Sequence, residues 1–300
     1  MRPELVTQPA PPKPLRLSGG PHGIVLFHGL SSSPLELQFI ARGLQRAGHS
    51  VYVPVIEGYT NGLSQGGPKS VAFWIAGALK ELDGALAECD TVSIGGLCLG
   101  AVLALRVAAL RSDQLTSVMA LSTALHYDGW GNPWYTPLLP LARYVPLAHR
   151  IKIKERHPYG IKDERMRAWV ARQMKELGES DAGASALRVI DLLKARELIA
   201  LTRASLHDIT TSVLLIHAKE DECAQPRSAY EVASRVRASI IRCIVLNDSY
   251  HMISIDREKE RVLSEMLQFL SHGDGRSEAG AFGRRSPIVS LFNPRNGTRP

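Results

Sequence analysis

The sequence lacks any apolar run long enough to cross a membrane. The best candidate, residues 100–110, spans 11 residues and contains Arg106, whereas a transmembrane helix needs ~20 apolar residues. The N-terminal residues, MRPELVTQPAPPKPLRLSGG, also lack the apolar segment of a secretory signal peptide. We therefore expect no transmembrane segment and a cytoplasmic location.

Cysteine is scarce: the chain of 300 residues has 4, at positions 89, 98, 223 and 243. None belongs to a Cys-x-x-Cys pair, so nothing in the sequence supports a zinc site or a thioredoxin-like motif. Free thiols are the expected state in a reducing compartment. We predict neither a metal ion nor a cofactor.

The chain has little excess charge outside its ends. Its net charge is +7, of which residues 1–20 carry +2 and residues 273–300 carry +3, so the 252 residues between them carry only +2. No interleaving of aromatic and basic residues accompanies this charge, as a nucleic-acid-binding surface would require. We do not expect nucleic acid as a partner.

The composition, 45% apolar and 22% charged, is that of a globular protein. Short apolar runs alternate with helical patterns, which favours an α/β fold with a mostly parallel sheet covered by helices on both faces. Strands are expected at 23–28, 50–55, 91–95, 115–122, 212–217 and 240–246, and helices at 34–47, 70–87, 99–111, 162–178, 184–205 and 256–271.

Three regions are expected along the chain. Residues 1–19 form a Pro-rich extension, residues 20–272 one α/β domain, and residues 273–300 a basic tail of disordered composition. The strand–helix alternation breaks at about 124–210, which indicates an insertion between two strands of the sheet.

The segment DTVSIGGLCLGA points to catalysis. Gly96, Cys98 and Gly100 follow a predicted strand and precede a predicted helix. This is the nucleophile-elbow pattern G-x-S-x-G with cysteine in place of serine. The helix N-terminus directs N–H groups at the thiol and favours the thiolate. The alternative is a glycine-rich packing turn with a small buried cysteine.

Three further segments supply partners for Cys98. Phe27-His28-Gly29-Leu30 follows the first predicted strand, so we expect the N–H groups of Leu30 and Leu99 to form an oxyanion hole. We interpret His28 as a structural side chain that orders this loop.

Asp221 and His251 each follow a predicted strand, in LLIHAKEDECAQP and NDSYHMISID. Glu220 and Glu222 compete with Asp221 for the role of the acid, but Asp221 has the expected offset from its strand. The order nucleophile, acid, base matches that of one hydrolase fold class. We predict a Cys98–Asp221–His251 triad. Cys223, two residues after Asp221, also raises the hypothesis of a redox pairing with Cys98.

On these segments, together with LFHGLSSSPLEL, residues 20–271 resemble the α/β-hydrolase superfamily. They are most similar to bacterial carboxylesterases and monoacylglycerol-lipase-like enzymes of the serine aminopeptidase S33 grouping. The resemblance implies an eight-stranded, mostly parallel sheet with a lid inserted after the sixth strand, near 124–210. It also assigns the oxyanion residues to Leu30 and Leu99, the acid to Asp221 and the base to His251.

Cys98 departs from this family, in which the nucleophile is serine. Cysteine at the elbow is also seen in enzymes similar to dienelactone hydrolase, in polyhydroxyalkanoate synthases and in some intracellular polyester depolymerases. We therefore predict a hydrolase of carboxylic esters or thioesters that works through an acyl-cysteine. The alternatives are an acyltransferase or polyester-synthase-like enzyme with the same triad, and a non-catalytic binding protein.

The expected substrate is a small, apolar acyl ester or thioester. Trp130, Trp134 and residues 135–144 of the insertion could line an acyl channel, or could simply pack the lid onto the core. The sequence leaves the acyl chain length, the leaving group and the oligomeric state open.

Overall fold

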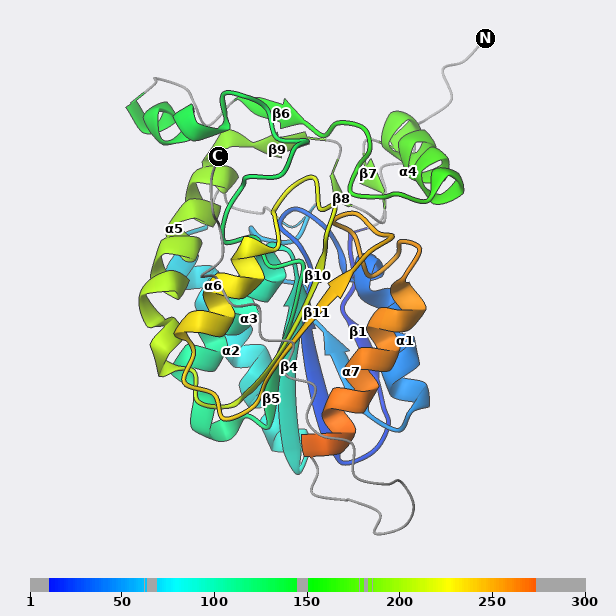
Figure 1. Cartoon of the computed structure of the whole chain (residues 1–300), viewed down its shortest axis with the longest axis vertical. Coiled ribbons are helices and arrows are strands. Elements are labelled where there is room, and N and C mark those ends of the chain that lie inside the picture. Colours follow the sequence, from blue (N-terminus) through cyan, green and yellow to red (C-terminus); the bar gives the residue numbers. More distant parts are fainter. Residues whose placement is uncertain are drawn as a thin grey trace, which may run out of the picture.

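A seven-stranded sheet runs through the middle of the protein (Figure 1). The computed structural model describes residues 11–61, 63, 69–144, 151–177, 179–180, 183–184 and 186–273. The strand order is β1-β3-β2-β4-β5-β10-β11. The strands are β1 (Leu15–Leu17), β2 (His22–Phe27), β3 (Ser50–Val53), β4 (Thr91–Leu97), β5 (Ser117–Leu121), β10 (Ser212–Ala218) and β11 (Ile241–Leu246). Only β1 is antiparallel to its neighbour, so the expected mostly parallel sheet is confirmed.

The number of strands differs from the expectation. The sheet has seven strands within the described residues, not the eight that the resemblance implies. The sheet also begins before residue 20, because β1 lies inside the expected Pro-rich extension and pairs with β3. Ahead of β1, the described residues 11–14 read Pro-Pro-Lys-Pro. Proline has no N–H to donate to a strand ladder, so this segment cannot extend the sheet as a regular strand.

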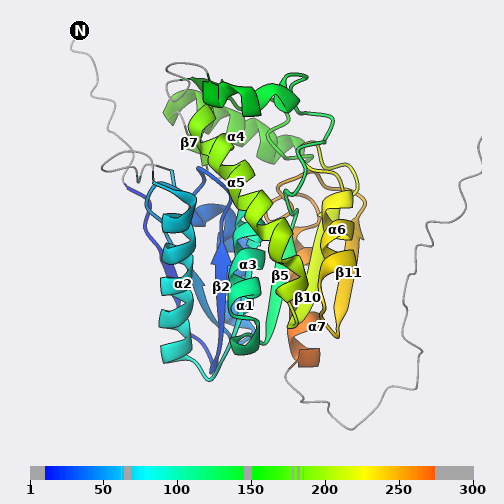
Figure 2. The same ribbon diagram turned by 90° about the vertical axis from the view of Figure 1, so that its left-hand side faces the viewer.

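Helices cover both faces of the sheet (Figures 1 and 2). One face carries α1 (Gln38–Arg46) and α7 (Lys259–Gly273), and the other α2 (Val71–Glu88), α3 (Leu99–Leu110), α5 (Val189–Ser205) and α6 (Arg227–Arg235). The apolar core accordingly divides into two clusters, one on each side of the sheet. No described helix is both long and apolar enough to span a membrane.

The strand order creates a crevice between β2 and β4. The chain passes from β2 to β3 on one side and then returns to β4, β5 and β10 on the other. At such a switch point the loops after two adjacent parallel strands diverge, and open α/β sheets bind their ligands there. The loop after β2 begins at His28, and the turn after β4 holds Cys98.

The chain between β5 and β10 forms an insertion outside the seven-stranded sheet. Its described elements are a 3₁₀ helix (Thr136–Tyr144), β6 (Lys152–Lys154) paired with β9 (Ala186–Arg188), α4 (Glu164–Leu177), and β7 (Glu179–Ser180) paired with β8 (Gly183–Ala184). These elements lie above the carboxyl ends of the strands (Figure 1). The insertion ends with α5, which packs against α3, where Arg106 donates a 2.8 Å hydrogen bond to Ser205.

Candidate active site

Cys98 occupies the sharp turn between β4 and α3. Its backbone has φ 58° and ψ −120°, a region that side chains with a Cβ rarely adopt and that is common at functional sites. A Cβ on Gly96 would overlap the backbone of Gly100, and a Cβ on Gly100 would overlap the carbonyl of Phe27. The two glycines are therefore required by the close approach of β4, α3 and the end of β2.

The surroundings of Cys98 favour its thiolate. A hydrogen bond from the Cys223 thiol lowers the pKa of Cys98 most, burial opposes this, and the charge of His251 and the backbone N–H of Leu99 lower it further. The net effect holds the Cys98 pKa well below its usual value. The pKa of Cys223 is raised instead, first by its hydrogen bond to Cys98 and then by burial. Cys98 is thus the more acidic thiol of the pair, and both cysteines are free.

His251 is held by Asp221. The two carboxylate oxygens lie 2.8 and 2.9 Å from Nδ1 of the imidazole. Burial lowers the pKa of His251, but the charges of Asp221 and of the Cys98 thiolate outweigh it, so the pKa is well above its usual value. Nε2 is buried and has no hydrogen-bond partner within the described residues. Because Nδ1 is engaged, Nε2 is the nitrogen available for proton exchange with the thiol.

Asp221 is fixed by its own loop. One carboxylate oxygen accepts hydrogen bonds from the N–H groups of Cys223 (2.9 Å) and Ala224 (2.8 Å), and His217 Nε2 lies 3.3 Å from the other. Burial raises the pKa of Asp221, but the charge of His251 and these partners outweigh it and keep the group ionised. The same loop therefore positions both the acid and the second thiol.

The N–H groups in the loop after β2 differ in whether they already have an acceptor. The N–H of Gly29 donates to Glu36 Oε1 at 2.5 Å, and the N–H of Ser31 donates to the carbonyl of Tyr59 at 3.0 Å. Between them, the N–H of Leu30 donates to no acceptor in the part of the chain that is described. Leu30 can therefore supply an oxyanion donor together with Leu99, the first residue of α3.

His28 orders this loop from inside. Its Nδ1 lies 2.7 Å from the carbonyl of Gly29 and its Nε2 2.9 Å from the Thr60 hydroxyl. Burial lowers its pKa to about 4, so the ring is neutral at pH 7. These contacts agree with the structural role expected for His28.

Glu36 is a buried acid that the sequence does not point to. Its side chain is 1% exposed, and burial raises its pKa to about 8 although the hydrogen bond from the N–H of Gly29 opposes the shift. The only signal in the sequence is a charged residue within the otherwise apolar and small segment SSSPLEL. Glu36 accepts the N–H of Gly29 and so fixes the loop that carries Leu30.

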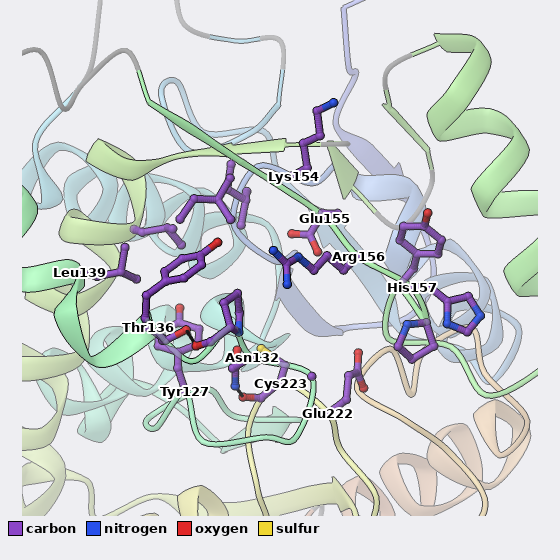
Figure 3. A pocket seen from close by; sticks show the side chains of 18 of the residues that line it. Tyr127, Asn132, Thr136, Leu139, Lys154, Glu155, Arg156, His157, Glu222 and Cys223 are labelled. Carbon is purple, nitrogen blue, oxygen red and sulfur yellow. Dashed lines mark hydrogen bonds between the residues drawn. The ribbon is translucent and has the colours of Figure 1, made fainter.

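A pocket that is partly open to solvent lies beside Cys223 under the insertion (Figure 3). Tyr127, Glu155 and Glu222 also line it. Burial raises the pKa of Glu222 to about 7. Glu222 additionally accepts the N–H of His251 at 3.1 Å. The pocket therefore borders Glu222 and Cys223, which lie next to His251 and Cys98.

The structure brings together the residues of the predicted triad and of the predicted oxyanion hole. Cys98, Asp221 and His251 converge, and the N–H groups of Leu30 and Leu99 lie beside the thiol's turn. Of the competing acids, Glu222 lies in the site without contacting the imidazole ring, and Glu220 pairs with Lys162 at the surface.

A comparison with known families agrees with this geometry. The profile described as "Alpha/beta hydrolase family" matches residues 24–265. The chain belongs to the alpha/beta hydrolase family. The match includes the elbow, the loop of Asp221 and the loop of His251, so the family assignment covers the whole candidate site.

Two bacterial relatives are similar along nearly their full length. A thermostable monoacylglycerol lipase of Bacillus sp. (strain H-257) is 21% identical over 263 residues, which cover 88% of this chain and 96% of the lipase. A carboxylesterase of Bacillus subtilis (strain 168) is 22% identical over 268 residues, which cover 88% and 98%. A solved structure described with the metagenome-derived lipolytic enzymes LipS and LipT has a TM-score of 0.74 at 21% identity and covers 87% of this chain and 97% of that one. This likeness establishes the fold.

Proposed function

We propose that this protein hydrolyses carboxylic esters and thioesters through a covalent acyl-Cys98 intermediate. The observation that carries the proposal is a thiol in an elbow turn, beside an imidazole whose Nδ1 is held 2.8 Å from Asp221. Its likeness to a lipase and a carboxylesterase supports acyl chemistry on esters.

Each residue of the site has a separate role in the proposed reaction. The Cys98 thiolate attacks the carbonyl carbon, and the N–H groups of Leu30 and Leu99 bind the resulting oxyanion. His251 donates a proton from Nε2 to the leaving group and then removes a proton from the attacking water. Asp221 keeps the Nδ1 proton in place and stabilises the imidazolium. A second attack, by water, releases the acid and regenerates Cys98.

A cysteine nucleophile selects among acyl donors. A thiolate displaces another thiolate in a nearly isoenergetic exchange, whereas an oxygen ester must be converted to the less stable thioester. Thioesters, lactones and activated esters are therefore the expected donors. The proposal also requires a free Cys98 thiol, which fits the cytoplasmic location predicted from the sequence.

The insertion acts as a lid over the site in this proposal. Apolar side chains line the pocket beneath it, namely Tyr135, Leu139, Ile153, Leu187 and Leu192. They provide an apolar wall for an acyl chain. Trp130 and Trp134, by contrast, are 61% and 84% exposed and do not line this pocket.

The test compares matched oxygen esters and thioesters, from short to long acyl chains, with wild type, Cys98→Ala and Cys243→Ala. Cys243 is an exposed thiol on β11 and serves as the matched control. We expect thioesters to be preferred, Cys98→Ala to abolish turnover and Cys243→Ala to leave it unchanged. Mass spectrometry should find the acyl group on Cys98.

The other outcomes separate the alternatives. An acyl-Cys98 adduct that forms but does not turn over in water would indicate an acyltransferase that lacks its acceptor. Full activity of Cys98→Ala would refute Cys98 as the nucleophile. Neither an adduct nor turnover on any substrate would favour a binding protein.

A further inference from the structure

Two arginines line the pocket beside Cys223 and have no acidic partner among the described residues. Arg156 follows β6 in the insertion, and Arg196 lies in α5. Figure 3 shows the Arg156 side chain directed into the middle of the pocket. Neither guanidinium makes an ion pair or a hydrogen bond within the described residues. Both are therefore available to a ligand.

Three other arginines in this part of the protein, unlike Arg156 and Arg196, form ion pairs with carboxylates. Arg188 pairs with Asp191 at 2.6 Å, Arg203 pairs with Glu231 at 2.8 Å, and Arg227 pairs with Asp128. Each of these lies near the same region but has its charge neutralised by a carboxylate. The two unpaired guanidiniums are the ones that share the pocket with Cys223.

The charges of Arg196 and Cys98 both act on the side chain of Tyr127. Burial raises the pKa of Tyr127 most and the charge of the Cys98 thiolate adds to this, whereas the charge of Arg196 lowers it. Tyr127 lines the pocket with both arginines. A ligand group held at the arginines would therefore share the pocket with Cys223, the thiol that neighbours Cys98.

The insertion carries a net positive charge, which also favours an anionic ligand. Residues 124–210 contain 14 Lys and Arg against 10 Asp and Glu, whereas the rest of residues 21–272 is net acidic. The excess charge between the two ends of the chain thus lies in the insertion that covers the site. Such a field attracts anionic small molecules to the pocket.

We propose that Arg156 and Arg196 bind a carboxylate carried by the substrate, so that the preferred substrates are esters or thioesters with a free carboxylate at one end. The proposal rests on the proposed function and names its substrate class. A guanidinium matches a carboxylate through paired N–H donors. Glu155 and Glu222 share the pocket and favour a monoanion over a phosphate dianion, because they repel the doubly charged group more strongly.

The test uses pairs of substrates that differ only in charge. The 4-nitrophenyl monoester of adipic acid carries the carboxylate on the acyl side, and its methyl ester is the neutral control. The hexanoate ester of 4-hydroxybenzoate carries it on the leaving group, with the methyl benzoate ester as control. The pair that shows the preference identifies the side of the scissile bond that faces the arginines.

The variants are Arg156→Gln, Arg196→Gln, and Arg203→Gln as the matched control in the same helix as Arg196. We expect kcat/KM of the wild type to favour the charged member of one pair. Each Gln variant of the two pocket arginines should reduce this preference by about 10- to 100-fold, the value of a hydrogen bond to a charged group. The loss should appear mainly in KM. Arg203→Gln and the neutral substrates should be unaffected.

Equal kcat/KM for the charged and neutral members of both pairs would overturn the proposal, while turnover that depends on Cys98 would leave the hydrolase function intact. Loss of turnover on every substrate would refute the hydrolase function instead. In that case calorimetric titration of Cys98→Ala with adipic acid monomethyl ester decides the question. Binding that weakens at least tenfold with Arg156→Gln supports the carboxylate site, and absent or unchanged binding overturns it.

Discussion

Glu36 should make the protein less stable as the pH rises. Its carboxyl has a pKa of about 8 in the folded state against 4.5 when exposed, because burial disfavours the charge. Between these values the folded protein holds a proton that the unfolded chain has released, so the free energy of unfolding falls as the pH increases. Glu36→Gln removes this titration and keeps an amide oxygen to accept the N–H of Gly29.

The magnitude follows from the separation of the two pKa values. Each pH unit between them is worth about 1.4 kcal/mol, so from pH 4.5 to pH 7 the wild type should lose about 3 kcal/mol relative to Glu36→Gln. Urea unfolding at pH 5, 6, 7 and 8, followed by tryptophan fluorescence, measures this difference. Glu260→Gln, at an exposed position in α7, is the control and should show no such trend.

A difference between wild type and Glu36→Gln that stays constant from pH 5 to pH 8 would refute the reasoning. The same variant should retain ester hydrolysis, because the Gly29 contact survives. Glu36→Ala removes the acceptor and leaves a buried N–H unpaired, at a cost of about 1–3 kcal/mol. It should therefore lose both stability and activity.

Three further changes have defined outcomes. Cys223→Ala should raise the pKa of the Cys98 thiol, seen as a shift of the pH profile of iodoacetamide alkylation to higher pH; an unchanged profile would contradict the role of Cys223 as hydrogen-bond donor. Asp221→Asn should lower kcat by about 10³- to 10⁴-fold, because the wrong imidazole tautomer is stabilised. Steady-state kinetics measures kcat, and an unfolding curve like that of the wild type shows that the variant is folded. Gly100→Ala should destabilise the fold by about 3 kcal/mol or more, because its Cβ would overlap backbone. The control is Gly84→Ala, inside a helix, where a Cβ would meet open space and should stabilise the fold by about 1 kcal/mol. Equal changes in the free energy of unfolding for Gly100→Ala and Gly84→Ala, measured in urea, would contradict the predicted overlap at Gly100.

The buried parallel strands were predictable from the sequence. β2, β4 and β10 lie within one or two residues of the expected 23–28, 91–95 and 212–217. Strands that are buried on both faces are continuous apolar runs, so their signal is local. α3 was equally clear, since it follows the elbow and is almost wholly apolar.

The helix α6 and the strand β1 were not predicted, because their sequence patterns are weak. α6 (Arg227–Arg235) buries only Ser228, Ala229 and Val232, so its apolar face is small and polar in part. It depends on packing against the sheet more than on its own sequence. β1 has three residues, and its place in the sheet comes from pairing with β3 some 35 residues away.

The sequence by itself determined the chemistry of the candidate site. The spacing around Cys98, and the places of Asp221 and His251 after strands, are local patterns that predict a nucleophile, an acid and a base. In a parallel sheet the carboxyl ends of all strands lie at one edge, so the order of the three residues also indicates that they meet.

Only the tertiary structure decided what surrounds that chemistry. No sequence motif predicts three of the contacts around the site. They are the contact of Cys223 with Cys98, the hydrogen bond from Gly29 to Glu36, and the position of Arg156 and Arg196 in one pocket. Such contacts depend on how the insertion folds over the sheet, and in the pocket they join residues far apart in sequence. Side-chain burial and charge pairing, which set pKa values and ligand preference, arise only once those segments are packed together.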